Sequence, residues 1–267
     1  GTGNGDPAGK NLGRIEIADA PGNPQILYAM GANATNSSVL GVWRSDDGGA
    51  NWTQRTTSSG IQSGGCSNAS GGGSQMWYDA GLTVDPNNPE TVLLSGVDLY
   101  RSINGGTTFQ DITCGYGNGN VHVDHHARAF LPNGFGGYDS NKLLSGSDGG
   151  VFYTANAQFG TGGSTTSNRP TFISLNQTIG SIELYSGDIT AGFATAANPG
   201  ASAGAQDNGS EYARWPSGNQ EPVQWTVRNG GDGIYTRIEP VNEQRWYYAS
   251  QNGAVVVSQT GPAGGTS

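Results

Sequence analysis

Short apolar runs alternate with turns rich in Gly, Asn and Pro along the whole chain. The segment IEIADAPGNPQILYAMG (15–31) reads as an alternating strand, a Pro/Asn turn and a second apolar strand, and LTVDPNNPETVLLSG (82–96) repeats this order. Residues that favour long helices, such as Ala, Leu, Glu and Lys, are scarce or scattered. The pattern therefore predicts an all-β chain with many tight turns.

A second repeated segment follows each of these strand pairs. The stretches VWRSDDGGANWTQ (42–54) and LYRSINGGTTFQD (99–111) align at an offset of 57 residues. Each reads as a strand, a glycine turn and a strand that opens with an aromatic residue. The matched positions are Ser45 with Ser102, Asp47 with Asn104, Gly49 with Gly106, and Trp52 with Phe109. Together the two patterns give four antiparallel strands per unit, which is the make-up of a propeller blade.

Five such units can be followed along the chain, with decreasing similarity. We expect them at residues 13–57, 76–113, 121–176, 183–228 and 231–259, the last without a fourth strand, within one domain spanning residues 1–267. Because five incomplete blades would close poorly, the expected fold is part of a larger β-propeller, or a propeller that strands from outside complete. A closed five-bladed propeller with a short last blade is the alternative.

Charge and cysteine content limit the classes of partner and compartment. The net charge of −9 and the absence of a basic stripe argue against nucleic acid and anionic membranes as partners. No apolar run of about 18 residues is present to span a bilayer. The two cysteines, Cys66 and Cys114, lie in Gly/Asn-rich segments, and they predict one disulfide in a secreted or cell-surface protein. Two free thiols are the alternative.

The glycine turn carries a family resemblance. The segment SDDGGANW (45–52) is similar to the Asp box of the BNR-repeat propellers, which include sialidases, xyloglucanases and sortilins, and SINGGTTF (102–109) is a weaker copy. The ordered segments 122–127, 146–152, 206–210, 230–235 and 250–253 resemble bacterial sortilin-like secreted propellers more closely. The resemblance implies that the Asp-box residues build the blades and take no part in ligand binding.

Loops that enter the first strand of a blade, or join its second and third strands, open on the same face of a propeller. The polar motifs fall on such loops, and we expect their side chains at the mouth of the central channel. The candidates are Tyr78, His122, Asp124, His126, Arg128, Asp148, Gln206, Asp207, Asn208 and Asp232. Strand alternation would place His122, Asp124, His126 and Arg128 on one face, and His125 on the other.

Three interpretations of this cluster stay open. The side chains could satisfy the backbone of Gly-rich loops and serve the fold alone. His122, Asp124 and His126 could bind a divalent metal, either zinc or calcium, together with Asp148 or Asp232. Asp148, Asp207 and Asp232 could instead supply the two carboxyl groups of a glycoside hydrolase.

Three functions follow from these interpretations. The resemblance to sortilin-type propellers implies a binding or scaffold module that holds a peptide or a glycan at the channel mouth. A xyloglucanase-like hydrolase is the second function, with Trp77, Tyr78, Trp215 and Trp225 as sugar platforms. The third is a structural subunit of an extracellular assembly, in which another chain completes the sheets. A sialidase is disfavoured because GRIEI (13–17) stands where that family has an Arg-Ile-Pro motif.

Overall fold

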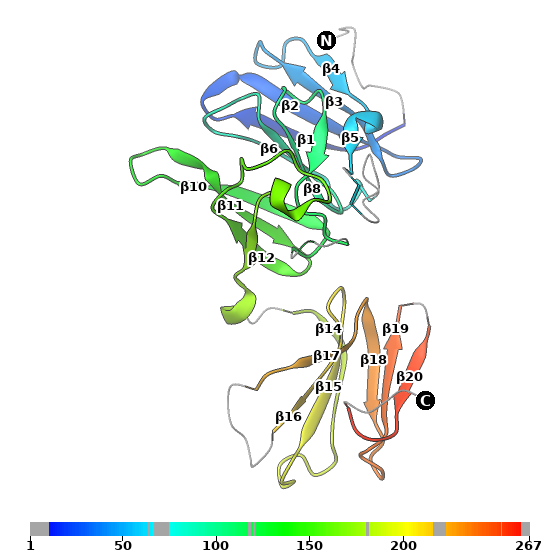
Figure 1. The fold of residues 1–267 in the computed structure, drawn as a ribbon. Helices are drawn as coiled ribbons and strands as arrows, with labels where there is room; N and C mark the ends of the chain where they lie inside the picture. The colour runs from blue at the N-terminus through cyan, green and yellow to red at the C-terminus, as the bar shows by residue number, and fades with distance from the viewer. Residues whose placement is uncertain are drawn as a thin grey trace. The chain divides into compact units, whose positions relative to one another are not determined.

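The computed structural model describes residues 11–63, 65–66, 75–116, 119, 121–179, 182–215, 223–251 and 253–262. Within these ranges the regular elements are strands, apart from three single-turn 3-10 helices, η1 (Ser58–Gly60), η2 (Thr166–Asn168) and η3 (Asn176–Thr178). The predicted all-β class is confirmed (Figure 1). None of the helices in the described ranges has the length and apolar character needed to cross a membrane. The chain forms two compact units, residues 1–179 and 180–267.

The first unit contains three sheets. The first sheet has the order β1 (Leu12–Ala20), β2 (Asn23–Asn33), β3 (Val39–Ser45) and β4 (Thr53–Thr56). The second has β6 (Gly81–Val84), β7 (Val92–Ser95), β8 (Leu99–Ser102) and β9 (Phe109–Asp111), and β5 (Ile61–Gln62) pairs in parallel with β9 at its edge. The third has β10 (His125–Pro132), β11 (Tyr138–Ser147), β12 (Gly150–Thr154) and β13 (Phe172–Ser174).

The second unit contains two sheets. One has the order β14 (Leu184–Ile189), β15 (Gly200–Ala205), β16 (Gly209–Arg214) and β17 (Thr226–Asn229). The other has three described strands, β18 (Gly233–Ile238), β19 (Trp246–Ser250) and β20 (Val255–Ser258). Apart from β5, each strand pairs antiparallel with its neighbour in sequence, which is the strand order of a propeller blade. These sheets agree with the predicted partial β-propeller; the parallel strand β5 was not predicted.

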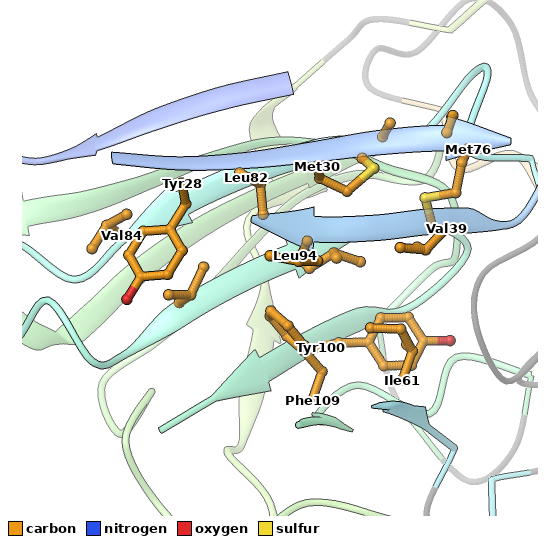
Figure 2. Close-up of a cluster of buried hydrophobic side chains, with 14 of the residues drawn as sticks. Tyr28, Met30, Val39, Ile61, Met76, Leu82, Val84, Leu94, Tyr100 and Phe109 are labelled. Carbon is orange, nitrogen blue, oxygen red and sulfur yellow. The ribbon is translucent and has the colours of Figure 1, made fainter. Parts of the chain in front are cut away.

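The middle sheet of the first unit is covered on both faces. All four residues of β7 are buried, so this strand lacks the polar alternation of a surface strand. Leu94 packs in a core cluster with Tyr28 and Met30 from the first sheet (Figure 2). Leu93 points the other way, into a cluster with Phe130 and Phe152 from the third sheet. Sequential sheets of this unit are therefore held together by hydrophobic contact across the middle one.

Small residues allow close packing in the second unit. Strand β15 reads GASAGA and is buried along its whole length. A Cβ atom at Gly204 would lie 2.7 Å from the carbonyl oxygen of Ile234, so a side chain there would push β18 away. The larger core residues, Trp246 and Tyr248, pack with Tyr212 from the neighbouring sheet.

The repeated glycine turns make the same hydrogen bonds in both copies. The hydroxyl of Ser45 accepts from the N–H of Gly49 at 2.9 Å, and Asp47 Oδ1 accepts from the N–H of Asn51 at 2.8 Å. In the second copy Ser102 accepts from Gly106 at 3.0 Å, and the Asn104 side-chain oxygen accepts from Thr108 at 3.0 Å. Asn can replace Asp here because the turn uses a side-chain oxygen as an acceptor and needs no charge.

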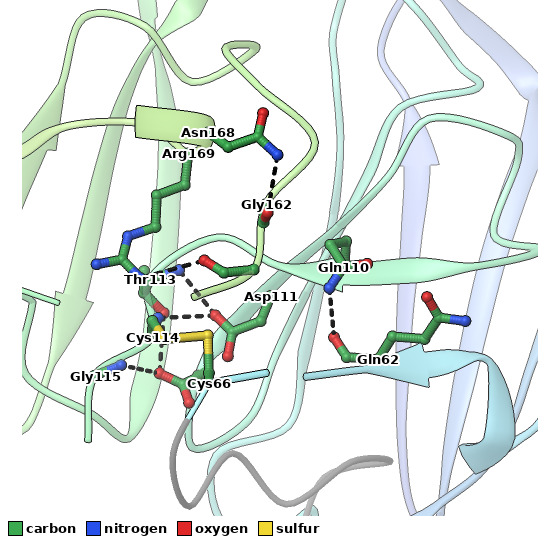
Figure 3. Close-up of a disulfide and its surroundings, with 12 residues drawn as sticks. Gln62, Cys66, Gln110, Asp111, Thr113, Cys114, Gly115, Gly162, Asn168 and Arg169 are labelled. Carbon is green, nitrogen blue, oxygen red and sulfur yellow. Dashed lines mark hydrogen bonds between the residues drawn. A yellow bond between two sulfur atoms is a disulfide. The ribbon is translucent and has the colours of Figure 1, made fainter. Parts of the chain in front are cut away.

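A disulfide joins Cys66 and Cys114, as predicted, with a Cα–Cα distance of 5.3 Å (Figure 3). It links the segment that follows β5 to the segment that follows β9. Both cysteines are buried. The bond closes a loop across a sequence separation of 48 residues, which restricts the unfolded chain.

We expect the Cys66→Ser/Cys114→Ser variant to lose about 4 kcal/mol of unfolding free energy, because the unfolded chain regains the loop entropy. Chemical denaturation of the oxidised protein and of the variant measures this difference. The oxidised protein treated with a reductant should unfold at the same denaturant concentration as the variant. Equal midpoints for oxidised protein and variant would contradict the prediction.

Candidate functional site

Three carboxyl groups from three loops of the first unit lie close together, and we call them the acidic cluster: Asp79, Asp124 and Asp148. Asp79 lies shortly before β6, and Asp124 lies directly before β10; these are the first strands of their sheets. Asp148 lies in the turn between β11 and β12. The N–H of Asp148 donates to the carbonyl oxygen of Asp124 at 3.2 Å. One carboxylate oxygen of Asp124 and one of Asp148 lie within 4.8 Å of each other.

The inner part of the acidic cluster is buried. Asp79 and Asp124 are 0% and 8% exposed, and their carboxyl groups are within hydrogen-bonding reach of each other. Gln75 Nε2 donates to Asp124 Oδ1 at 3.2 Å and to Asp79 Oδ2 at 3.5 Å. Burial, followed by the charges of Asp124 and Asp148, raises the pKa of Asp79 to about 8. Burial and the charge of Asp148 also raise the pKa of Asp124.

The outer part of the acidic cluster meets solvent beside aromatic rings. His126 Nε2 lies 2.6 Å from Asp148 Oδ1, and the Tyr78 hydroxyl donates to Asp148 Oδ2 at 3.4 Å. The rings of Tyr78 and His126 meet edge to face with centroids 4.7 Å apart, and the Trp77 ring lies 5.5 Å from Tyr78. Trp77 is 62% exposed and Tyr78 is 38% exposed. We call Trp77, Tyr78, His126 and Asp148 the aromatic–acidic surface.

The histidines do not follow the alternation that was expected. Strand β10 begins only at His125, Asp124 has a positive φ of 63°, and the register shifts between His125 and Ala127. His125 is fully buried with Nδ1 2.9 Å from the Ser145 hydroxyl, and burial lowers its pKa to about 3, so the ring is neutral. His122 lies ahead of the strand, with Nδ1 3.1 Å from the carbonyl oxygen of Val123. The expected common strand face was wrong because a bulge interrupts it.

Arg128 lies further along the same strand and packs inward. Its guanidinium covers Gly81 of β6 and donates to the hydroxyls of Thr83 and Ser95, at 3.3 Å to Thr83. Burial lowers its pKa to about 10. These contacts tie β10 to β6 and β7. A Cβ atom at position 81 would displace the guanidinium from this position.

The second unit brings together the other candidate residues. Asp232 Oδ1 accepts from the N–H of Asp207 at 3.0 Å, and Asp207 has a positive φ of 59°. The Gln206 side chain accepts from the Tyr185 hydroxyl, and Asn208 Nδ2 donates to the carbonyl oxygen of Gln206 at 2.9 Å. The QDNGS and GGDG loops are therefore bonded to one another within this unit.

Two of the proposed sugar platforms also lie in the second unit. Trp215 and Trp225 meet edge to face with centroids 6.3 Å apart, and Phe193 lies 5.1 Å from Trp215. Trp225 is 40% exposed.

A second pair of buried carboxyl groups, Asp98 and Asp111, lies beside the disulfide. Asp98 Oδ1 accepts from the Thr113 hydroxyl at 3.1 Å and the Gly115 N–H at 2.6 Å. Asp111 Oδ1 accepts from the N–H groups of Thr113 and Cys114 at 2.9 and 2.8 Å (Figure 3). Burial and the charge of Asp98 raise the pKa of Asp111 to about 8. Asp111 and Gln75 were not predicted from the sequence, because no local motif marks them.

No protein-family model matches this chain, and no curated protein matches its sequence. Solved structures give weak likenesses. An ancestral GH74 enzyme is 16% identical over 91% of this chain and 33% of its own, with a TM-score of 0.36. YCF48 from Cyanidioschyzon merolae is 12% identical over 95% and 69% of the two chains, with a TM-score of 0.38. Saccharomyces cerevisiae Sqt1 is 10% identical over 93% and 60%, with a TM-score of 0.37.

This chain thus spans a third of the length of the GH74 enzyme and 60% of that of Sqt1. All three likenesses lie below 25% identity and below a TM-score of 0.5. The fold assignment therefore rests on the sheets described above, and the assignment of a function must rest on the chemistry of the sites.

We expect the buried Asp98–Asp111 pair to make stability depend on pH. A carboxyl group whose pKa is raised by folding stabilises the protein fully below its unfolded pKa of about 3.9. That stability is lost as pH rises toward the folded pKa of about 8. Unfolding free energies measured from pH 4 to pH 8 should therefore decline.

The Asp111→Asn variant should decline less over this pH range, because an amide needs no proton to bond to Asp98. Its oxygen can keep the backbone bonds from Thr113 and Cys114. An unchanged slope in this variant would show that Asp111 does not titrate in this range.

Proposed function

We propose that this chain is a binding module and that its aromatic–acidic surface holds a glycan. The observation that carries the proposal is the contact of the exposed Tyr78 side chain with both members of the His126–Asp148 pair, next to the exposed ring of Trp77. Adjacent exposed aromatic rings beside a polar pair are the kind of surface to which ligands bind. A sugar ring offers an apolar face to the aromatic rings and hydroxyl groups to the polar pair.

The charge of the chain narrows the class of glycan. The net charge is −9, and the acidic cluster lies directly behind the aromatic–acidic surface. An anionic glycan would be repelled at this site, so the expected ligand is a neutral one. A peptide with a basic side chain is the other ligand class, because Asp148 could accept from a cation and Tyr78 could stack on it. Oxidising conditions, which the Cys66–Cys114 bond requires, fit a secreted or cell-surface location.

Titration calorimetry with neutral oligosaccharides tests the proposal. The Trp77→Ala variant should bind about 10-fold more weakly, because it loses a stacking contact of about 1 kcal/mol or more. Trp225→Ala is the control, since it removes a partly exposed tryptophan from the second unit. Equal loss in both variants, or no loss in Trp77→Ala, would contradict the proposed position. Binding of basic peptides but not of oligosaccharides would show that the ligand is a peptide and not a glycan.

Glycoside hydrolysis is a second candidate, because a specific distance favours it. Carboxylate oxygens of Asp124 and Asp148 lie within 4.8 Å of each other, a proximity that favours the retaining over the inverting arrangement, in which the carboxyl groups are about 6.5–9.5 Å apart. One carboxyl group would protonate the leaving oxygen and the other would attack the sugar. Asp207 and Asp232 are less suited to this role as a pair, since Asp232 already accepts from the backbone of Asp207.

An assay for new reducing ends with a panel of polysaccharides separates the two functions. If the chain is a hydrolase, Asp148→Asn should lower sugar release at least 100-fold, because the variant lacks one of two essential carboxyl groups. An Asp207→Asn variant is run as the matched comparison from the second unit. Binding without release of sugar would leave the binding module as the function.

A further inference from the structure

We propose that the acidic cluster binds a calcium ion between Asp79, Asp124 and the side-chain amide oxygen of Gln75, with Asp148 on its outer side. This inference does not depend on which ligand the aromatic–acidic surface holds. It differs from the metal site predicted from sequence, which consisted of His122, Asp124 and His126.

The carboxyl groups of Asp79 and Asp124 receive few hydrogen-bond donors. The buried pair of Asp98 and Asp111 receives three backbone N–H groups and one hydroxyl on its two Oδ1 atoms. Asp79 and Asp124 share a single amide group, that of Gln75, at 3.5 and 3.2 Å. A third carboxylate, Asp148, lies next to them. Buried carboxylates that lack donors require a proton or a cation.

One buried carboxylate oxygen of the acidic cluster lacks a hydrogen-bond partner among the described residues. Asp79 is 0% exposed, and its Oδ1 atom has no hydrogen-bond partner among the described residues. The carboxyl group of Asp79 meets that of Asp124 inside the cluster. Asp98 Oδ2 and Asp111 Oδ2 are also buried without a partner among the described residues, but each of those carboxyl groups accepts at least one backbone N–H group on its Oδ1 atom. Asp79 accepts only from the side-chain amide of Gln75 among the described donors, and a bound cation would satisfy its remaining oxygen.

Side-chain atoms of Gln75, Asp79 and Asp124 converge within the acidic cluster. The Gln75 amide group lies within hydrogen-bonding distance of oxygens from two different loops, one before β6 and one before β10. Rotation of that amide by about 180° exchanges its nitrogen and oxygen, which have nearly the same shape. Three oxygen atoms from Gln75, Asp79 and Asp124 would then surround one position. Water molecules and Asp148 could supply the remaining ligands of an ion that takes 6–8 oxygens.

The donor set favours calcium over zinc. The converging atoms are oxygens, which suit hard cations, whereas zinc prefers histidine nitrogen and cysteine sulfur. His126 Nε2 and His125 Nδ1 already contact Asp148 and Ser145. His122 Nδ1 contacts a backbone oxygen. The Asp148 side chain is 14% exposed, so an ion can enter from the aromatic–acidic surface.

Thermal unfolding with calcium or with EDTA tests the site in the full chain. At a calcium concentration about 100-fold above Kd, the midpoint should rise by roughly 5–10 °C relative to EDTA. Terbium gives a second readout that does not depend on stability, because Trp77 and Tyr78 are near enough to sensitise its luminescence. Calcium should displace terbium and quench that emission.

Two variants and one control locate the ion. Asp79→Asn and Asp124→Asn should lose both the rise in midpoint and the terbium emission, while their circular dichroism spectra show that they fold. Asp111→Asn, which alters the other buried acid pair, should keep both responses. The proposal is overturned if calcium and EDTA give equal midpoints, or if Asp79→Asn still responds. A response to zinc alone that His126→Ala abolishes would also overturn it, in favour of the histidine site.

Discussion

Burial of both faces of the middle sheet is the constraint on which the first unit depends. Leu93 and Leu94 are adjacent in β7 and point to opposite core clusters, one shared with the first sheet and one with the third. A strand with two buried faces cannot tolerate a shift in register, since every side chain would exchange one core for the other. The positions of the loops at the ends of these strands, and of the carboxyl groups that they carry, follow from this packing.

The loops of the acidic cluster are held by backbone bonds to that middle sheet. Asp124 and His125 donate their N–H groups to the carbonyl oxygens of Val97 and Gly96, in the turn between β7 and β8. The Ser95 hydroxyl donates to the carbonyl oxygen of Asp79. These bonds keep Asp79 and Asp124 together beside the buried middle sheet. The hydrophobic packing on both faces of the middle sheet thus stabilises the arrangement of the carboxyl groups in the cluster.

The sequence predicts the parts of this structure that depend on short-range bonds. The glycine turns could be identified from an offset of 57 residues because their hydrogen bonds span at most four residues, as between Asp47 and Asn51. The side-chain directions near His125 could not be predicted in the same way. The bulge there arises where the backbone bonds to Gly96 and Val97, a tertiary contact with no local sign. Gln75 contacts Asp124 across 49 residues, so no motif contains both.

The supply of hydrogen-bond donors distinguishes the two buried acid pairs of the first unit. Asp98 and Asp111 are equally buried, yet backbone N–H groups from residues 113–115 complete one oxygen of each, so the pair organises the loop next to the disulfide. Asp79 and Asp124 organise no such loop, and the one amide that reaches them comes from a side chain that can turn over. Local rules of polar satisfaction are most often broken where a protein binds something. By the number of backbone donors, the first pair serves the fold, and the second pair is the place where we propose the calcium ion.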